Sequence, residues 1–208
     1  MTEQENKELR YASDEDVQFY YKSISGLPTL SGLNGSGKDK FGIPLPYGTG
    51  PHSVRCFREI VDNVKPLKIF EIGTNMGWSA AVLLELAPKA LMLSCDISYK
   101  DETTEAAKTL TERFNPRFTY KNRLEGEFHE LMEFHKKAPF DLAFIDGGHL
   151  IDDVKADLRL CLDLGITNIS MDDWLPEFGQ VQEAVATFGN QLEVINVNGN
   201  IALLKRKI

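Results

Sequence analysis

Residues 68–80 read Lys-Ile-Phe-Glu-Ile-Gly-Thr-Asn-Met-Gly-Trp-Ser-Ala, and this stretch decides the fold. A short apolar run ends near Glu71, glycines follow at Gly73 and Gly77, and a helical pattern begins at Trp78. Glycine lets the backbone turn sharply and come close to a ligand. The first turn of a helix presents unpaired N–H groups and the positive end of its dipole. The order strand, glycine turn and helix therefore predicts a binding site for a nucleotide-like ligand at the carboxyl end of a parallel strand.

Apolar runs of strand length alternate with amphipathic helical patterns over most of the chain. This alternation predicts an α/β fold, with a doubly wound, mostly parallel, seven-stranded sheet and helices on both faces. Asn198 and Gly199 separate the last two apolar runs, which predicts a C-terminal antiparallel hairpin. Strands are expected at 67–72, 91–95, 118–120, 140–145, 166–171, 192–197 and 201–205. Helices are expected at 79–86, 102–114, 128–134 and 152–164, with further helical stripes from 52 and from 181.

The beginning of the chain differs from the rest. Ser13 followed by Asp16 resembles a helix start, and residues 23–51 are rich in Gly, Ser and Pro without clear periodicity. A long loop of this kind in a compact domain is usually a lid or a binding loop. We therefore expect two parts: residues 1–51, an N-terminal helix with a lid, and residues 52–208, the ligand-binding domain.

The overall composition excludes several classes of protein. The 208 residues carry a formal net charge of −8, so we expect no nucleic acid and no anionic membrane as a partner. No apolar run reaches the ~18 residues that a membrane span needs, and the acidic start does not resemble a secretory signal. Cys56, Cys95 and Cys161 lie far apart among apolar residues, which predicts buried free thiols. These features together predict a cytoplasmic protein.

Acidic residues follow four of the predicted strands, as Glu71, Asp96, Asp146 and the pair Asp172-Asp173. The carboxyl ends of parallel strands lie along one edge of the sheet, so these side chains should meet there. A single aspartate at such a junction can be an ordinary helix cap. A shared site explains all of them together, because buried carboxylates need partners or a ligand. Asp96 follows Glu71 by 25 positions, near the ~20-residue offset at which an acid binds ribose hydroxyls.

Three motifs resemble those of the class I S-adenosylmethionine-dependent methyltransferases, and among them the metal-dependent O-methyltransferases of the catechol and macrolide-sugar type. The motifs are the glycine turn of residues 71–80, Phe-Ile-Asp146-Gly-Gly-His149, and Met-Asp172-Asp173-Trp. The resemblance covers the chain after its N-terminal part. It implies an enzyme that transfers a methyl group from S-adenosyl-L-methionine to a hydroxyl of a small molecule such as a phenol, a catechol or a sugar.

The same resemblance implies the cofactor contacts. In the family the acid of the glycine turn lies near the methionine amino group, the glycines pass under the cofactor, and a serine reaches its carboxylate. Carried over, these residues are Glu71, Gly73 and Ser79, and Asn75 is counted with them. The acid after the second strand, Asp96, would bind the ribose hydroxyls. The family's Gly-Asp-Ser after the third strand is replaced here by Asn-Arg-Leu, so the adenine contacts stay unassigned.

The resemblance also implies a metal site and a general base. Asp146, Asp172 and Asp173 would hold Mg²⁺ or another divalent cation, since such cations prefer carboxylate oxygens. His149 would be the base, because imidazole titrates near ~6.5. The alternatives are an ordinary histidine at a helix start and a hydrated aspartate turn. Trp174 would be either a wall of the acceptor site or an apolar plug.

Other functions stay open at this point. One is a metal-independent methyltransferase with His149 as the only base, and another is a non-catalytic cofactor-binding protein of the same fold. Residues 32–39 nearly match a phosphate-binding loop, but Asp39 stands where that motif needs Ser or Thr, and no strand precedes it. The expected partner is a small hydroxyl acceptor, and a homo-oligomer is an open alternative.

Overall fold

The computed structural model describes residues 12–28, 50–97, 100–125, 128, 132, 135, 139–176 and 179–207. Its strands are β1 (Lys68–Ile72), β2 (Leu91–Asp96), β3 (Phe118–Asn122), β4 (Leu142–Ile145), β5 (Asn168–Met171), β6 (Leu192–Asn198) and β7 (Ile201–Arg206). They form one sheet in the order β3-β2-β1-β4-β5-β7-β6. Neighbouring strands from β3 to β5 are parallel, and β7 is antiparallel to both β5 and β6. The predicted mostly parallel sheet with a C-terminal antiparallel hairpin is confirmed.

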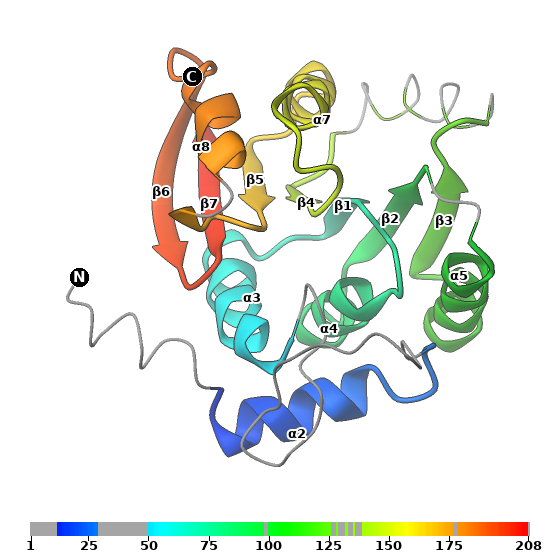
Figure 1. Ribbon diagram of the computed structural model, residues 1–208. Helices are drawn as coiled ribbons and strands as arrows, with labels where there is room; N and C mark the ends of the chain where they lie inside the picture. The colour runs from blue at the N-terminus through cyan, green and yellow to red at the C-terminus, as the bar shows by residue number, and fades with distance from the viewer. Residues whose placement is uncertain are drawn as a thin grey trace.

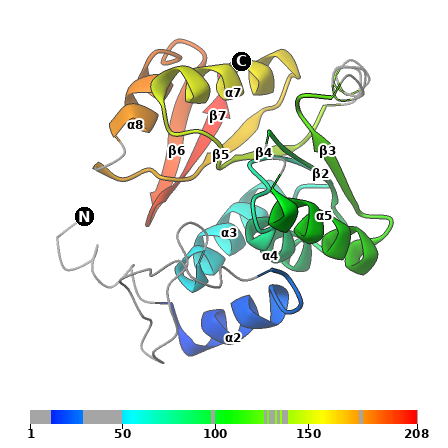
Figure 2. The same ribbon diagram turned by 45° about the vertical axis from the view of Figure 1, so that its right-hand side comes forward.

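Helices cover both faces of this sheet. They are α2 (Asp14–Ser23), α3 (Pro51–Val64), α4 (Trp78–Leu86), α5 (Asp101–Phe114), α7 (Ile151–Asp163) and α8 (Gly179–Ala186). Figure 1 shows α3, α4 and α5 on one face and α7 and α8 on the other. In the turned view of Figure 2, α2 lies outside α3 and α4 as a further layer. The helix expected at 128–134 falls mostly outside the described residues.

The core has one apolar cluster on each face of the sheet. Successive residues of β1 point to opposite faces, so Ile69 joins the cluster under α3 and α4 while Phe70 joins the cluster under α7. Both side chains are fully buried. Phe57 of α3 packs edge-on against Phe144 of β4, with ring centroids 5.0 Å apart. The central strands are covered by helices on both faces and are therefore mostly apolar. Glu71 in β1 is an exception, since it is a buried acid.

The N-terminal helix packs onto the same core. Ser13 caps α2, as its sequence predicts, by accepting a hydrogen bond from a backbone N–H of the first turn. Tyr20 of α2 is buried in the cluster that also contains residues of α3 and α4. The indole Nε1 of Trp78 donates to the carbonyl of Pro28 at 3.2 Å, which ties the chain after α2 to the start of α4. Residues 29–49 of the expected lid lie outside the described residues.

Two strands begin later than predicted, for a physical reason. Phe140 precedes β4 but belongs to the core, since its ring stacks on that of Phe70 at 5.2 Å between centroids. Ile166 precedes β5, and its N–H donates to the carbonyl of Cys161 at the end of α7 instead of to a strand. Apolar character alone cannot separate strand residues from buried turn residues. The three cysteines are free and buried, as expected, and no helix among the described residues is long and apolar enough to cross a membrane.

Candidate active site at the carboxyl edge of the sheet

The glycine turn between β1 and α4 brings the ends of three strands together. Gly73 has φ +97°, and its N–H donates to the carbonyl of Cys95 in β2 at 2.8 Å. A Cβ on Gly73 would lie 2.0 Å from the carbonyl oxygen of Asp146, which follows β4. Gly77 has φ +73° and directly precedes α4. The turn therefore requires glycine for its backbone conformation and for the close approach of the β4 end.

Glu71 lies at the centre of a buried network of hydroxyl groups. Ser79 donates to Glu71 Oε1 at 2.7 Å, and Ser94 donates to Oε2. Thr74 Oγ1 lies 2.7 Å from Ser94 Oγ. Glu71 is fully buried, and this burial raises its pKa to about 7, against the lowering effect of the two hydroxyls. Both carboxyl oxygens thus bind protein hydroxyls, and the expected contacts of Glu71 and Ser79 with a cofactor stay predictions.

Asp96 lies at the end of β2, where an acid for ribose hydroxyls was expected. Its Oδ2 accepts the backbone N–H of Asn75 at 2.9 Å, so it also fixes the glycine turn. Asn75 is exposed and has φ +42°, one of few non-glycine residues in that region. Asp96 and Asn75 are therefore together at the same edge, beside Gly73, as the sequence predicts for a common site.

Two exposed apolar side chains flank Asp96, and sequence reasoning missed both. Ile97 directly follows β2 and is 61% exposed, and Leu124 follows β3 and is 64% exposed. The register pairs Asp96 with Asn122, so these two side chains belong to neighbouring strand ends. Large exposed apolar residues on both sides of an acid suit the faces of an aromatic base. Their signal in the sequence was an apolar residue one or two positions after the end of a strand.

Asp146 and Asp172 follow the neighbouring strands β4 and β5. The N–H of Asp172 donates to the carbonyl of Ile145 at 3.0 Å, which fixes the two strand ends side by side. Burial raises the pKa of Asp146 well above its ordinary value, and Asp172 and Asp173 raise it further. Burial and the Asp173 charge raise the pKa of Asp172 to about 7. The edge therefore accumulates carboxyl groups that repel one another and would gain from a cation.

His149 pairs with Asp173 across this edge. Its Nδ1 lies 2.8 Å from Asp173 Oδ2, with side chains 50% and 16% exposed. The hydrogen bond with Asp173 is the main cause that raises the pKa of His149. The loop that carries His149 runs close over α7, because a Cβ on Gly148 would lie 2.6 Å from Asp153 Oδ2. The predicted base is thus at the site, held by one of the predicted metal ligands.

Asp146, Asp172 and Asp173, the predicted metal ligands, directly follow the adjacent strands β4 and β5. In the part of the chain that the structure describes, no group of three His, Cys, Asp or Glu side chains is arranged to hold a metal ion. Asp173 is engaged by His149. The chemistry of the remaining donors still suits a hard cation, since Asp172 Oδ2 is buried and accepts no hydrogen bond from any described residue. The metal ligands Asp146, Asp172 and Asp173 stay a prediction.

Asn200, at the turn between β6 and β7, reaches this site as well. Its Nδ2 donates to Asp172 Oδ1 at 2.5 Å, and its carbonyl accepts the N–H of Trp174 at 2.7 Å. Trp174 is partly buried and packs against the core cluster under α7 and α8, as an apolar plug would. The sequence identified the hairpin turn but gave no indication that Asn200 contacts an acid across the sheet.

A largely buried ion pair lies next to the loop that follows β4 at the carboxyl edge of the sheet. Arg123 NH1 lies 2.6 Å from Asp157 Oδ1, with side chains 22% and 4% exposed. A Cβ on Gly147 would lie 2.9 Å from Asp157 Oδ2, so the loop that follows Asp146 lies directly against this pair. The ion pair joins the end of β3 to α7. Arg123 belongs to the Asn-Arg-Leu stretch for which the sequence suggested no role.

Comparisons with known proteins agree with this architecture. An O-methyltransferase from Bacillus cereus, solved with SAH, is 16% identical, with a TM-score of 0.64 over 98% of this chain and 96% of that one. The O-methyltransferase TomG of Streptomyces achromogenes, solved with SAM, is 15% identical, with a TM-score of 0.61 over the whole of both chains. The described chain therefore has the fold of the class I S-adenosylmethionine-dependent O-methyltransferases. A methyltransferase-domain family model matches residues 70–166, from β1 to the end of α7.

Curated relatives match about half of the chain. A protein-L-isoaspartate O-methyltransferase of Shewanella halifaxensis is 30% identical over 106 residues, which are 49% of this chain and 46% of that protein. A protein of the same name from Pyrococcus horikoshii is 26% identical over 132 residues, which are 59% of this chain and 57% of that protein. The chain thus spans about half the length of the curated relatives it matches.

Proposed function

We propose that the protein transfers a methyl group from S-adenosyl-L-methionine to a hydroxyl oxygen of a small molecule. The observation that carries this proposal is the pairing of His149 Nδ1 with Asp173 Oδ2 at 2.8 Å, at the edge where this fold binds its ligands. A hydroxyl is a weak nucleophile while it is protonated, so a base at this point has a task to perform. The fold's solved neighbours with SAM or SAH bound support the cofactor.

The cofactor would lie over the ends of β1, β2 and β3. Asp96 offers a carboxylate for the ribose hydroxyls, and Ile97 and Leu124 offer apolar surface for the adenine. When bound, S-adenosylmethionine would supply a methyl group from its positively charged sulfonium. Acidic residues of the edge, above all Asp146, would favour that positive charge through the Coulomb attraction. Glu71 and Ser79 would support the turn from below.

His149 would remove the proton of the acceptor hydroxyl. Asp173 holds Nδ1, so Nε2 is the ring nitrogen that would accept the proton. The new bond joins the acceptor oxygen to the methyl carbon, the bond from sulfur to that carbon breaks, and the proton stays on His149 until solvent takes it. The products are a methyl ether and S-adenosylhomocysteine. Because Asp173 already orients His149, less conformational entropy would be lost when the base is positioned against the substrate.

A divalent cation, when bound, would lower the pKa of the acceptor hydroxyl. Asp146 and Asp172 would hold it, because they lie on adjacent strand ends and Asp172 Oδ2 accepts no hydrogen bond from any described residue. The alternative is a metal-independent reaction in which the dyad of His149 and Asp173 is sufficient. Sensitivity of the reaction to EDTA separates these two cases.

A second candidate acceptor is the carboxylate of an isoaspartyl peptide, as in the names of the curated relatives. The sequence match with these relatives, 30% identity over 106 residues with one of them, favours it. Charge argues against it. A carboxylate acceptor would lie beside Asp146, Asp172 and Asp173, where carboxylate charges already disfavour one another.

The test is a methyl-transfer assay with labelled S-adenosylmethionine and three classes of acceptor: catechols and phenols, sugars, and an isoaspartyl peptide. We expect transfer to at least one hydroxyl acceptor and none to the peptide. His149→Gln should abolish transfer, while Asp152→Asn, at an exposed position of α7, should not change it. Transfer to the peptide alone would contradict the proposal. Cofactor binding in calorimetry without any transfer would favour a non-catalytic protein.

A further inference from the structure

The turn between β6 and β7 is built into the acidic edge. Asn200 precedes β7, and both its side chain and its backbone contact residues that follow β5. Asn200 Nδ2 donates to Asp172 Oδ1 at 2.5 Å, and the carbonyl of Asn200 accepts the N–H of Trp174 at 2.7 Å. These two contacts bracket Asp173, so the hairpin turn determines where the Asp172 carboxylate lies.

This contact leaves two oxygen atoms without donors. Asp172 Oδ2 and Asn200 Oδ1 are both buried, and neither accepts a hydrogen bond from any residue that the structure describes. Asp172 as a whole is only 3% exposed. A buried acceptor without a partner loses its hydrogen bonds to water and gains none in return. Two such acceptors, on side chains that are hydrogen-bonded to each other, would both be satisfied by one shared ligand.

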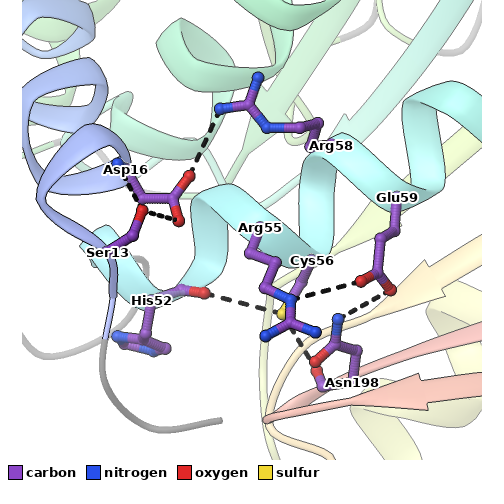
Figure 3. Close-up of polar contacts among 8 residues, drawn as sticks. All are labelled: Ser13, Asp16, His52, Arg55, Cys56, Arg58, Glu59 and Asn198. Atoms are coloured by element: carbon purple, nitrogen blue, oxygen red, sulfur yellow. Dashed lines mark hydrogen bonds and ion pairs between the residues drawn. The ribbon is translucent and has the colours of Figure 1, made fainter.

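The turn is held in place from its other side by α3. Figure 3 shows Asn198 beside Cys56 and Glu59 of that helix. Asn198 Nδ2 donates to Glu59 Oε2 at 2.8 Å, and Cys56 Sγ donates to the carbonyl of Asn198 at 3.1 Å. Gly199 lies against the same sulfur, since a Cβ on it would be 3.6 Å away. The position of Asn200 is therefore fixed by the fold before any ligand binds.

The charge around these oxygens selects the kind of ligand. Asp146 and Asp173 lie next to Asp172, and their effects on one another raise the pKa of the buried carboxyls. His149 is paired with Asp173 and also acts on Asp172 through its charge. An anion or a neutral acceptor would be disfavoured here, whereas oxygen atoms from carboxylates and amides are common ligands of divalent cations.

We propose that Asn200 is a metal ligand of this site, and that its amide oxygen, together with Asp172 and Asp146, holds a divalent cation in the place that the sequence assigned to Asp173. This inference rests on the metal-assisted form of the proposed function. Asp173 would then act on His149, and Asn200 would complete the oxygen set. The hairpin turn is part of the site and not only the end of the sheet.

The experiment measures Mn²⁺ binding by electron paramagnetic resonance on the full chain without cofactor or acceptor. We expect Asn200→Ala to weaken Mn²⁺ binding about 10- to 100-fold, as the loss of supporting groups at metal sites does. Asn196→Ala is the matched control, since Asn196 is an exposed asparagine on the same hairpin. It should bind Mn²⁺ as the wild type does. Circular dichroism checks that each variant folds.

Asn200→Asp separates a ligand from a hydrogen-bond donor. It keeps an oxygen at the same position but loses the Nδ2 that binds Asp172. If Asn200 is a ligand, Asn200→Asp binds Mn²⁺ more tightly than Asn200→Ala. If Asn200 acts only as a donor, the aspartate variant binds no better than the alanine variant, and the proposal is wrong. If the alanine variant fails to fold, Asn200→Asp is compared with the wild type instead. Mn²⁺ binding that is about 10-fold or more weaker than that of the wild type would then contradict the proposal, because the oxygen is kept and only Nδ2 is lost.

Three outcomes would overturn the inference. The first is no Mn²⁺ binding by the wild type at millimolar concentration, the second is an Asn200→Ala affinity within twofold of the wild type, and the third is a larger loss in Asp173→Asn than in Asn200→Ala. None of them touches methyl transfer itself, which is measured separately with EDTA. Transfer that persists in EDTA would leave the proposed activity standing and remove only its metal-assisted form.

Discussion

Replacement of Glu71 by glutamine should change how the stability of the protein depends on pH. Glu71 is fully buried, and burial raises its pKa from 4.5 to about 7. In the unfolded chain this carboxyl ionises at its ordinary pKa, so between pH 4.5 and 7 the native state binds more protons than the unfolded state. The free energy of unfolding of the wild type therefore falls as the pH rises through this window. Glutamine does not ionise, so its variant lacks this contribution.

The magnitude follows from the two pKa values. From pH 5.5 to pH 8 this one carboxyl lowers the free energy of unfolding by about 2 kcal/mol, since one pKa unit corresponds to about 1.4 kcal/mol. The stability of Glu71→Gln relative to the wild type should rise by this amount, or by about 4 to 8 °C in Tm for a chain of this size. The glutamine amide keeps an acceptor for Ser79, and Ser94 Oγ can accept from its Nε2. The hydroxyl network therefore survives the substitution.

Urea unfolding followed by circular dichroism from pH 5.5 to 8 measures this difference. Asp172 contributes to both proteins and cancels on subtraction. The charge of Glu71 also raises the pKa of Asp146, so the measured difference contains this smaller coupling as well. Glu193→Gln, at an exposed position of β6, controls for the loss of one negative charge. If the curves of Glu71→Gln and the wild type run parallel over this range, Glu71 is ionised in the native protein and the reasoning from burial is refuted.

Four further substitutions test the site. His149→Gln should lower kcat for hydroxyl methylation about 100- to 10,000-fold with little change in cofactor affinity, because it removes the base; unchanged steady-state kinetics would exclude that role. Asp173→Asn should move the rise of the pH–rate profile to lower pH, because the hydrogen bond with Asp173 raises the pKa of His149 and the base must be unprotonated; a midpoint that stays in place contradicts this. Asp96→Ala should weaken binding of S-adenosylmethionine about 10-fold or more in calorimetry, since it removes the acid expected at the ribose; an equal Kd would place the ribose elsewhere. Gly73→Ala should lower the free energy of unfolding by about 2 to 4 kcal/mol in urea titrations, because its Cβ would lie 2.0 Å from a carbonyl oxygen and φ is +97°; a loss below about 1 kcal/mol would mean that the turn relaxes.

The parts of the fold that could be predicted from the sequence are those in which a residue type limits the backbone conformation. Residues 68–80 form the predicted strand, turn and helix, and Gly73 and Gly77 have the positive φ angles that glycine permits. The hairpin predicted from Asn198 and Gly199 is present, and its turn consists of Gly199, with φ +59°, and Asn200. In each case the residue type limits the backbone directly, so no knowledge of distant parts of the chain was needed.

The partners of the site residues depend on register and on contacts between distant segments. Ser94 binds Glu71 because the two residues are paired in the register of β1 and β2, which the order of residues does not reveal. Asp172 meets Asn200 because β7 inserts beside β5. The sequence correctly predicted that acids gather at one edge, but it could not tell which side chains would bind one another there. The pairing of His149 with Asp173 is a case in point.

The position of β7 has a consequence for synthesis of the chain on the ribosome. This strand lies between β5 and β6, yet it is translated after both of them. A nascent chain that stops short of residue 201 presents the edge of β5 without its neighbour, and unpaired strand edges promote association with other chains. Asp172 also lacks its asparagine partner until then. The acidic edge can therefore mature only after the residues of β7 have emerged.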